Sequence, residues 1–487
     1  MFNRRSWSAE VFSLCLLTLP LVAWSAPGPE KIPVTTVSEE ARQFYLQGRD
    51  ANEKLRATDA YLLFEKAVAK DAAFALGYLG LANSAPTNKT FFAALSRAVA
   101  LSDKVTEGER LMILGLNAGA TGDVDGQRRM YEELVAKYPA DERALTLLGN
   151  YYFGLQDYPA AIRYLTQATE IAPNFTTPYN QLGYAFRFEG KYPEAEKTFK
   201  KYIELLPGDP NPYDSYGELL MKMGRFDESV VSYRKALEID PHFIASFIGI
   251  ANDQMFQGNG DEARKTLRQM AGVARNDGER RQALFWTAQS YVLEGRSRDA
   301  IRAVGEERAI AQKSGDLSAQ SGDATFLGNI LLHAGQLDAA AGSFAEANAL
   351  MAKAAVPAEV KEANRRNSLF NTARVALKRG DLKTAQAQAE LYRSQVAAKQ
   401  IPFEVWQVHE LLGMVAIAQR DYERALAELA KSSGQNPRVL YLTAVALQGK
   451  GDAQRAQLAA QAVANFNALN VAYVFVRPEA QKMATGS

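Results

Sequence analysis

Two consecutive stretches of equal length decide the fold of this chain: ERALTLLGNYYFGLQDYPAAIRYLTQATEIAPNF at 142–175 and TTPYNQLGYAFRFEGKYPEAEKTFKKYIELLPGD at 176–209. The pattern continues every 34 residues as far as Pro241. Its fixed points are a glycine, a large side chain and a proline in each unit, namely Gly149, Gly183 and Gly217, then Leu165, Phe199 and Tyr233, then Pro173, Pro207 and Pro241. A strict period of this length is typical of a repeat solenoid, and it favours a binding role over catalysis.

The residue types within each unit resemble the tetratricopeptide repeat. In the unit that begins at Glu142, the family's positions 4, 7, 8, 11, 20, 24, 27 and 32 are Leu145, Leu148, Gly149, Tyr152, Ala161, Leu165, Ala168 and Pro173. A small residue at position 8 lets a large residue of the neighbouring helix come close to the backbone. Proline at position 32 cannot continue a helix, so it marks the break between units. The resemblance implies an all-α, right-handed superhelical solenoid of stacked antiparallel helix pairs.

The same register can be laid along most of the chain and predicts about twelve helical hairpins. Its units start near residues 41, 75, 108, 142, 176, 210, 244, 281, 321, 366, 406 and 437. Position 8 is Gly or Ala in every unit, although that position was used to align the weaker ones. Position 15 is independent of the alignment and is glycine in eight units, at 122, 190, 224, 258, 295, 335, 380 and 451. A left-handed glycine there is expected to end the first helix of each unit.

The spacing divides the chain into a regular part and a less regular part. After residue 244 most units start 37 to 45 residues apart, which predicts longer helices or loops. The polar stretch 275–280 is the expected seam. We therefore expect a signal peptide at 1–25, an extended leader at 26–40, a regular array at 41–275, a less regular array at 276–470 and a cap or tail at 471–487. One continuous solenoid is the preferred interpretation, and two separate helical lobes are the alternative.

The first residues have the pattern of a secretory signal. Arg4 and Arg5 precede an apolar run at 11–23, and small residues stand where cleavage after Ser25 requires them. This predicts a periplasmic or secreted protein, with an uncleaved N-terminal anchor as the alternative. No later segment approaches the roughly 18 consecutive apolar residues of a membrane span, so none is expected in the mature chain.

The cysteine content indicates the compartment, and the charge balance argues against one class of partner. Cys15 is the one cysteine of the chain and would be removed with the signal, which suits an oxidising compartment. Without residues 1–25 the chain keeps 54 basic and 54 acidic side chains. This zero balance argues against nucleic-acid binding, which needs clustered positive charge.

The sequence offers no pattern of catalytic, cofactor-binding or metal-binding residues. Its three histidines, His242, His333 and His409, fall in three different units. No phosphate-binding loop, dinucleotide fingerprint, zinc-protease motif or nucleophile elbow occurs. We therefore expect no cofactor and no enzymatic activity. An active site formed between two lobes, with carboxylates beside His333 or His409, is the remaining enzymatic alternative.

The expected site is the concave groove, which in tetratricopeptide repeats is formed by the first helix of each unit. Position 9 carries an amide side chain in several units: Asn83, Asn150, Asn252, Gln289 and Asn329. An amide can donate to a carbonyl and accept from an N–H of one peptide unit, so a ladder of them would hold an extended peptide. The alternative is that asparagine is a tolerated polar residue beside the packing position.

Aromatic and charged side chains occupy other groove positions. The aromatic residues are Phe153, Tyr184, Phe188, Phe256 and Phe285, and the charged residues are Arg187, Asp214, Glu218 and Lys222. An exposed aromatic strip usually marks a partner site, and packing across a tight superhelix is the competing interpretation. The groove has no single charge sign.

The preferred hypothesis is therefore a non-catalytic scaffold that binds a protein or an extended peptide in its groove. A structural or assembly component of the cell envelope, acting through its convex surface, is the alternative. The sequence does not identify the partner or the oligomeric state.

Overall fold

The computed structural model describes residues 31–54, 56–399 and 401–486. Within these residues the chain contains 25 α-helices and no β-strand, so the predicted all-α class is confirmed. The predicted signal peptide, its cleavage position and Cys15 lie outside the described residues.

The helices of the first half are short, as shown by the 15 residues of α1 and the 14 residues of α2. They are α1 (Glu39–Glu53), α2 (Ala57–Lys70), α3 (Ala75–Asn83), α4 (Asn88–Leu101), α5 (Glu107–Thr121), α6 (Val124–Lys137), α7 (Glu142–Gly154), α8 (Tyr158–Ile171), α9 (Thr177–Phe188), α10 (Tyr192–Leu205), α11 (Pro210–Lys222), α12 (Phe226–Ile239), α13 (Ile244–Phe256) and α14 (Gly260–Val273).

The helices of the second half are longer in its middle, reaching 22 residues in α19. They are α15 (Asp277–Leu293), α16 (Ser297–Lys313), α17 (Leu317–His333), α18 (Leu337–Lys353), α19 (Ala358–Arg379), α20 (Leu382–Ala397), α21 (Pro402–Ala418), α22 (Tyr422–Leu429), α23 (Pro437–Lys450), α24 (Ala453–Ala464) and α25 (Tyr473–Thr485). The wider spacing of the sequence pattern therefore corresponds to longer helices.

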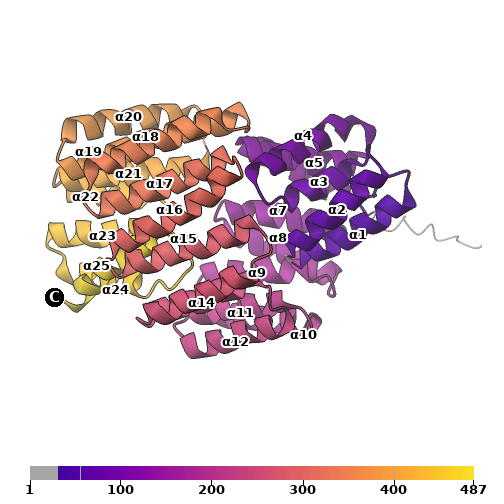
Figure 1. Cartoon of the computed structure of the whole chain (residues 1–487), viewed down its shortest axis with the longest axis horizontal. Coiled ribbons are helices and arrows are strands. Elements are labelled where there is room, and N and C mark those ends of the chain that lie inside the picture. The colour runs from indigo at the N-terminus through magenta and orange to yellow at the C-terminus, as the bar shows by residue number, and fades with distance from the viewer. Residues whose placement is uncertain (1–30, 55, 400, 487) are drawn as a thin grey trace, which may run out of the picture.

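The helices stack as twelve successive hairpins, from α1–α2 to α23–α24, and α25 follows the last of them (Figure 1). Each helix packs on the helix before it and the helix after it, and first helices also pack on the first helices of adjacent hairpins. The stack continues through the expected seam, because α14 and α15 pack on each other. This is the solenoid that the sequence predicts.

The spacing between paired helices depends on the small residue at position 8. All twelve of these residues are buried. A Cβ added to Gly183 on α9 would lie 2.6 Å from the ring of Phe199 on α10, and Phe199 is fully buried. The same contact recurs between Gly217 and Tyr233. The large residue therefore packs directly on the partner helix's backbone, which fixes the distance between the two helices.

Local signals set where many helices begin and end. Several second helices start at an aspartate whose carboxylate accepts from a backbone N–H of the first turn, as Asp123 does from Gly126 at 2.8 Å. The eight glycines at position 15 all have φ between 72° and 89°. The predicted left-handed helix ends are thus confirmed. Four units lack the glycine, and in two of them Gln156 and Arg420 adopt the same conformation, with φ of 59° and 62°.

The leader is extended and crosses the starts of two first helices. Ile32 donates its backbone N–H to Asp141, the N-cap of α7, at 2.9 Å. Thr35 donates its backbone N–H to Glu109, in the first turn of α5, at 2.6 Å. Carboxylates at helix starts therefore hold residues 31–36 as an extended segment that belongs to no β-sheet.

The array curves until distant hairpins meet (Figure 1). At one meeting point the Asn88 amide, at the start of α4, donates to the Ser318 hydroxyl, at the start of α17, over 2.9 Å. At another, Arg275 lies 3.5 Å from the carboxylate of Asp59 on α2. These contacts join hairpins that are far apart in sequence.

Arg420 provides a test of the helix-ending rule. A non-glycine residue in the left-handed region costs about 1–2 kcal/mol, partly offset by the larger unfolded-state entropy of glycine. We expect Arg420→Gly to raise the free energy of unfolding by about 0.5–1 kcal/mol, measured by urea denaturation. Gly335→Ala is the matched control, because φ is 75° there and no neighbour lies within 4 Å of the added Cβ. It should lower stability by a similar amount, and a destabilising Arg420→Gly would contradict the rule.

Candidate functional site

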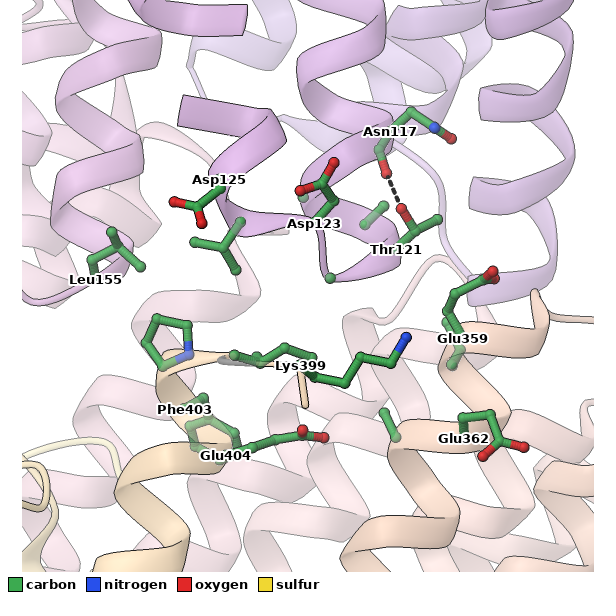
Figure 2. Close-up of a pocket in the computed structure, with 18 of the residues that line it drawn as sticks. Asn117, Thr121, Asp123, Asp125, Leu155, Glu359, Glu362, Lys399, Phe403 and Glu404 are labelled. Carbon is green, nitrogen blue, oxygen red and sulfur yellow. Dashed lines mark hydrogen bonds between the residues drawn. The ribbon is translucent and has the colours of Figure 1, made fainter. Parts of the chain in front are cut away.

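A cleft of about 1150 Å³ opens where the curved array brings its two halves together. One wall is formed by the end of α5, the start of α6 and the end of α7. The other wall is formed by the start of α19, the segment that joins α20 to α21, and the start of α21. Figure 2 shows the two walls facing each other, with the Lys399 side chain running between them.

The cleft carries charges of both signs. Asp123 and Asp125 stand on the α6 wall, and Glu359 and Glu362 stand on the α19 wall (Figure 2). Lys399 lies among these four carboxylates and forms no ion pair within 4 Å in the described part of the chain. The cleft can therefore bind a partner that has both acidic and basic groups.

A buried ion pair supports the α19–α21 wall. Arg366 on α19 donates from Nε and Nη2 to the carboxylate of Glu404 on α21, with the closest approach at 2.8 Å. Both side chains are buried, and both line the cleft. Because a paired guanidinium–carboxylate contact has a defined geometry, it fixes the orientation of α21 relative to α19.

The apolar part of the cleft is aromatic. Phe403, on the first turn of α21, has 62% of its surface exposed. Tyr151 and Tyr152 line the opposite wall, with ring centroids 5.2 Å apart in an edge-on arrangement. Tyr152 is further positioned by a hydrogen bond of 3.2 Å from its hydroxyl to Glu132. Exposed aromatic groups in a concave site are typical of binding surfaces.

The sequence does not predict this cleft. Its two walls are far apart in sequence, and the repeat pattern gives no information about which units meet after the array has curved. Phe403 stands early in α21, before the register predicts the unit to start, so it matched no groove position. The one indication in the sequence is that Phe403 is a large apolar residue close to a predicted helix start, where an exposed side chain can serve in binding.

The central part of the predicted groove is covered by the chain itself. Residues 466–480 pack against the first helices of several hairpins. Lys222 donates to the backbone carbonyl of Phe466 at 2.5 Å, and the Phe256 ring contacts the Tyr473 ring with centroids 5.3 Å apart. Phe285 belongs to the same apolar cluster as Val474. Burial lowers the pKa of Lys222 to about 8.

Several of the predicted groove residues are therefore not exposed. Arg187, Asn252, Phe256 and Gln289 are buried. The Asn252 amide donates to the Ile248 carbonyl of its own helix at 2.8 Å, so it does not present its donor to a groove. Superhelical curvature and the returning segment close these positions, and neither can be read from one repeat.

A compact network contains most of the predicted residues of α7, α9 and α11. Arg187 forms an ion pair of 2.6 Å with Glu218, and Tyr184 donates its hydroxyl to Glu218 at 2.8 Å. The Arg187 guanidinium also lies 4.6 Å from the Phe188 ring centre, and the Phe188 and Phe153 centroids are 5.7 Å apart. These side chains bind one another, as the packing alternative predicts.

The remaining predicted residues are dispersed. Asn83 is exposed, and Asn150 is half-buried with no hydrogen bond to its Oδ1. Asn329 accepts from Arg374 at 2.8 Å. Asp214 accepts from the Ser246 hydroxyl at 2.7 Å, and burial raises the pKa of its carboxyl to about 7. The amide ladder is therefore not continuous.

The histidines lie in separate surroundings. His409 pairs with Glu428 at 2.7 Å, His333 packs edge-on against Phe475 at 5.4 Å, and His242 contacts the Val273 carbonyl at 2.9 Å. Among the described residues, no group of three or more His, Cys, Asp or Glu is arranged to hold a metal ion.

Comparison with protein families decides what kind of repeat this is. Family models described as tetratricopeptide repeat match residues 142–175, 177–209 and 220–285. These matches cover the hairpins α7–α8 and α9–α10 and then run from the end of α11 into α15. The chain is a tetratricopeptide repeat protein. Tetratricopeptide repeats are in general non-catalytic scaffolds for protein–protein interaction, and the resemblance predicted from sequence is confirmed.

Several solved tetratricopeptide repeat structures share parts of the stack. A crystal structure of MamA is 24% identical and covers 34% of this chain and 91% of its own, with a TM-score of 0.29. MamA from Desulfovibrio magneticus RS-1 is 15% identical over 34% of this chain and 94% of its own, with a TM-score of 0.30. A repeat protein from Parabacteroides merdae is 16% identical over 54% and 99%, with a TM-score of 0.37. At these scores the likenesses carry no argument about function.

A search of curated proteins finds no significant match to this tetratricopeptide repeat protein. None of the helices in the described ranges is both long and apolar enough to cross a membrane.

Proposed function

We propose that the cleft between the α5–α7 wall and the α19–α21 wall binds a segment of a partner protein, and that the chain acts as a non-catalytic scaffold. The observation that carries the proposal is Phe403, whose largely exposed ring lines a cavity of about 1150 Å³ formed by two distant parts of the array. An exposed aromatic side chain in a concave site offers a partner apolar surface to bury, which is how interface anchors contribute affinity.

The lining suits a polypeptide. Aromatic rings, backbone at helix ends and charges of both signs match a segment that carries side chains of mixed type. Lys399 offers a cation to an acidic partner residue, and Asp123 and Asp125 offer anions to a basic one.

The leader supports the proposal by showing how this array holds a peptide. The carboxylate of Asp141 accepts from the Ile32 backbone N–H and that of Glu109 from the Thr35 backbone N–H, in the way that an extended partner segment would be held. Of the positions proposed for the concave groove, Asn83 is exposed and Asn150 half-buried, so groove binding remains a proposal for the N-terminal hairpins.

We also propose that the scaffold works in the periplasm or outside the cell. The proposal is supported by the basic and apolar pattern of the segment 1–25. Intact-mass measurement of the protein from soluble periplasm should give a chain that starts at Ala26. Recovery of the uncleaved chain, still starting at Met1, from the cytoplasm would contradict the proposal. Recovery from the membrane fraction would favour the alternative, an envelope component.

Phe403→Ala tests the cleft. Removing an anchoring aromatic side chain should weaken partner binding at least tenfold, which corresponds to about 1.4 kcal/mol. Circular dichroism first confirms that the wild-type chain and the variant have equal helicity. Partners are then crosslinked to each chain in living cells, recovered from the periplasmic extract and quantified.

The matched control is Leu458→Ala on α24, because Leu458 is also an exposed apolar side chain, at 58%, and lies outside the cleft. The proposal expects partners to be lost with Phe403→Ala and retained with Leu458→Ala. Equal capture by all three proteins would contradict it.

A further inference from the structure

Residues 466–486 contact the array in the way that a bound ligand contacts a receptor. The non-helical segment 465–472 leads away from α24, and α25 then lies against α23 and α24 on one side and α15 on the other. Its side chains reach the first helices of three earlier hairpins, α13, α15 and α17. A cap of the last hairpin would need only the contacts with α23 and α24.

Two residues of the segment anchor it in the groove. The Arg477 guanidinium donates to the Phe256 carbonyl at the end of α13 over 2.9 Å and to the Tyr473 hydroxyl over 3.1 Å. The Tyr473 ring packs against the rings of Phe256 and Phe466, with centroids 5.3 and 5.7 Å away. Tyr473 and Arg477 are one helical turn apart, so they lie on the same face of α25.

The fit is incomplete in its polar contacts. Arg477 is only 9% exposed, and Lys222 is half-buried. Among the described residues, neither side chain has a carboxylate partner within 4 Å. Both cations also lie over aromatic rings, Arg477 over Phe256 and Lys222 over Phe466, and without a carboxylate partner they retain part of their desolvation cost.

The groove side shows the same incompleteness. Gln289 on α15 is 0% exposed, and neither its Oε1 nor its Nε2 has a hydrogen-bond partner. It stands four residues after Phe285 and three before Val292, and both of these share an apolar cluster with Val474. Gln289 therefore points to the face that the segment covers, and the segment leaves its amide unpaired.

We propose that the groove of α11, α13, α15 and α17 is a second, separate peptide-binding site, occupied in this structure by the chain's own residues 466–486. Its external ligand is a partner segment that repeats the pattern of Phe466, Tyr473 and Arg477. The segment has one aromatic residue in the place of Phe466, and it continues as a helix with a second aromatic residue followed four residues later by an arginine. Such a helix competes with the internal segment, and one that also offers a polar side chain to the amide of Gln289 gains a hydrogen bond that the internal segment lacks.

The test uses the full-length chain and a fluorescein-labelled synthetic peptide of residues 466–486. In the wild-type chain the internal segment has an effective concentration near millimolar, so we expect no binding at about 10 µM peptide. In the Arg477→Ala chain the internal segment is weakened, and we expect the unmodified peptide to bind at least tenfold more tightly than to the wild type, measured by fluorescence anisotropy.

Two controls define the outcome. The Arg455→Ala chain, which loses an exposed arginine paired with Asp452 at the start of α24, should bind as the wild type does, and a peptide carrying the Arg477→Ala change should bind the Arg477→Ala chain more weakly. A folded Arg477→Ala chain that fails to bind the unmodified peptide overturns the proposal, because the segment is then a fixed part of the fold.

Hydrogen exchange of the wild-type chain keeps the proposal testable if Arg477→Ala does not fold. The proposal expects amides of 473–485 to exchange faster than those of α23 and α24. Equal protection in the two regions overturns it.

Discussion

The structure depends on one contact that recurs in both halves of the array, that of a large side chain with the backbone of its partner helix at a glycine, as at Gly48, Gly183 and Gly413. Where Phe199 meets Gly183, an added Cβ would lie 2.6 Å from the ring, so the glycine sets how closely the two helices approach. The twelve hairpins add their small rotations, and the sum is the curvature of the array. That curvature brings α4 to α17 and the α5–α7 wall to the α19–α21 wall, and the cleft exists because they meet.

Sequence reasoning could predict what each unit dictates locally. The hairpin starts, the buried position 8 and the left-handed glycines such as Gly335 follow from contacts within one or two repeats. It could not predict which residues remain exposed, because that depends on units that are distant in sequence. Gln289 and Phe256 stand at groove positions yet are buried, and Phe403 stands at none yet lines the cleft.

Both ends of the described chain are used as ligands of the array. Residues 31–36 are held through backbone N–H groups and carboxylates, and residues 466–480 through aromatic rings and one guanidinium. These are two different modes of peptide binding on a single scaffold. The C-terminal segment accounts for the covered central part of the predicted groove, and the site proposed for a partner lies in the cleft between the two halves.

The cleft requires the array to close on itself, and a crosslink across the meeting point of α4 and α17 measures this closure most directly. Cys15 is the one native cysteine and lies in the predicted signal, so Asn88→Cys with Ser318→Cys introduces a clean thiol pair in the mature protein. The account predicts that a short bifunctional thiol reagent joins the two sites within one monomer, at protein concentrations too low for intermolecular reaction. Labelling of both thiols by a monofunctional reagent without any intramolecular crosslink would contradict closure, and with it the cleft.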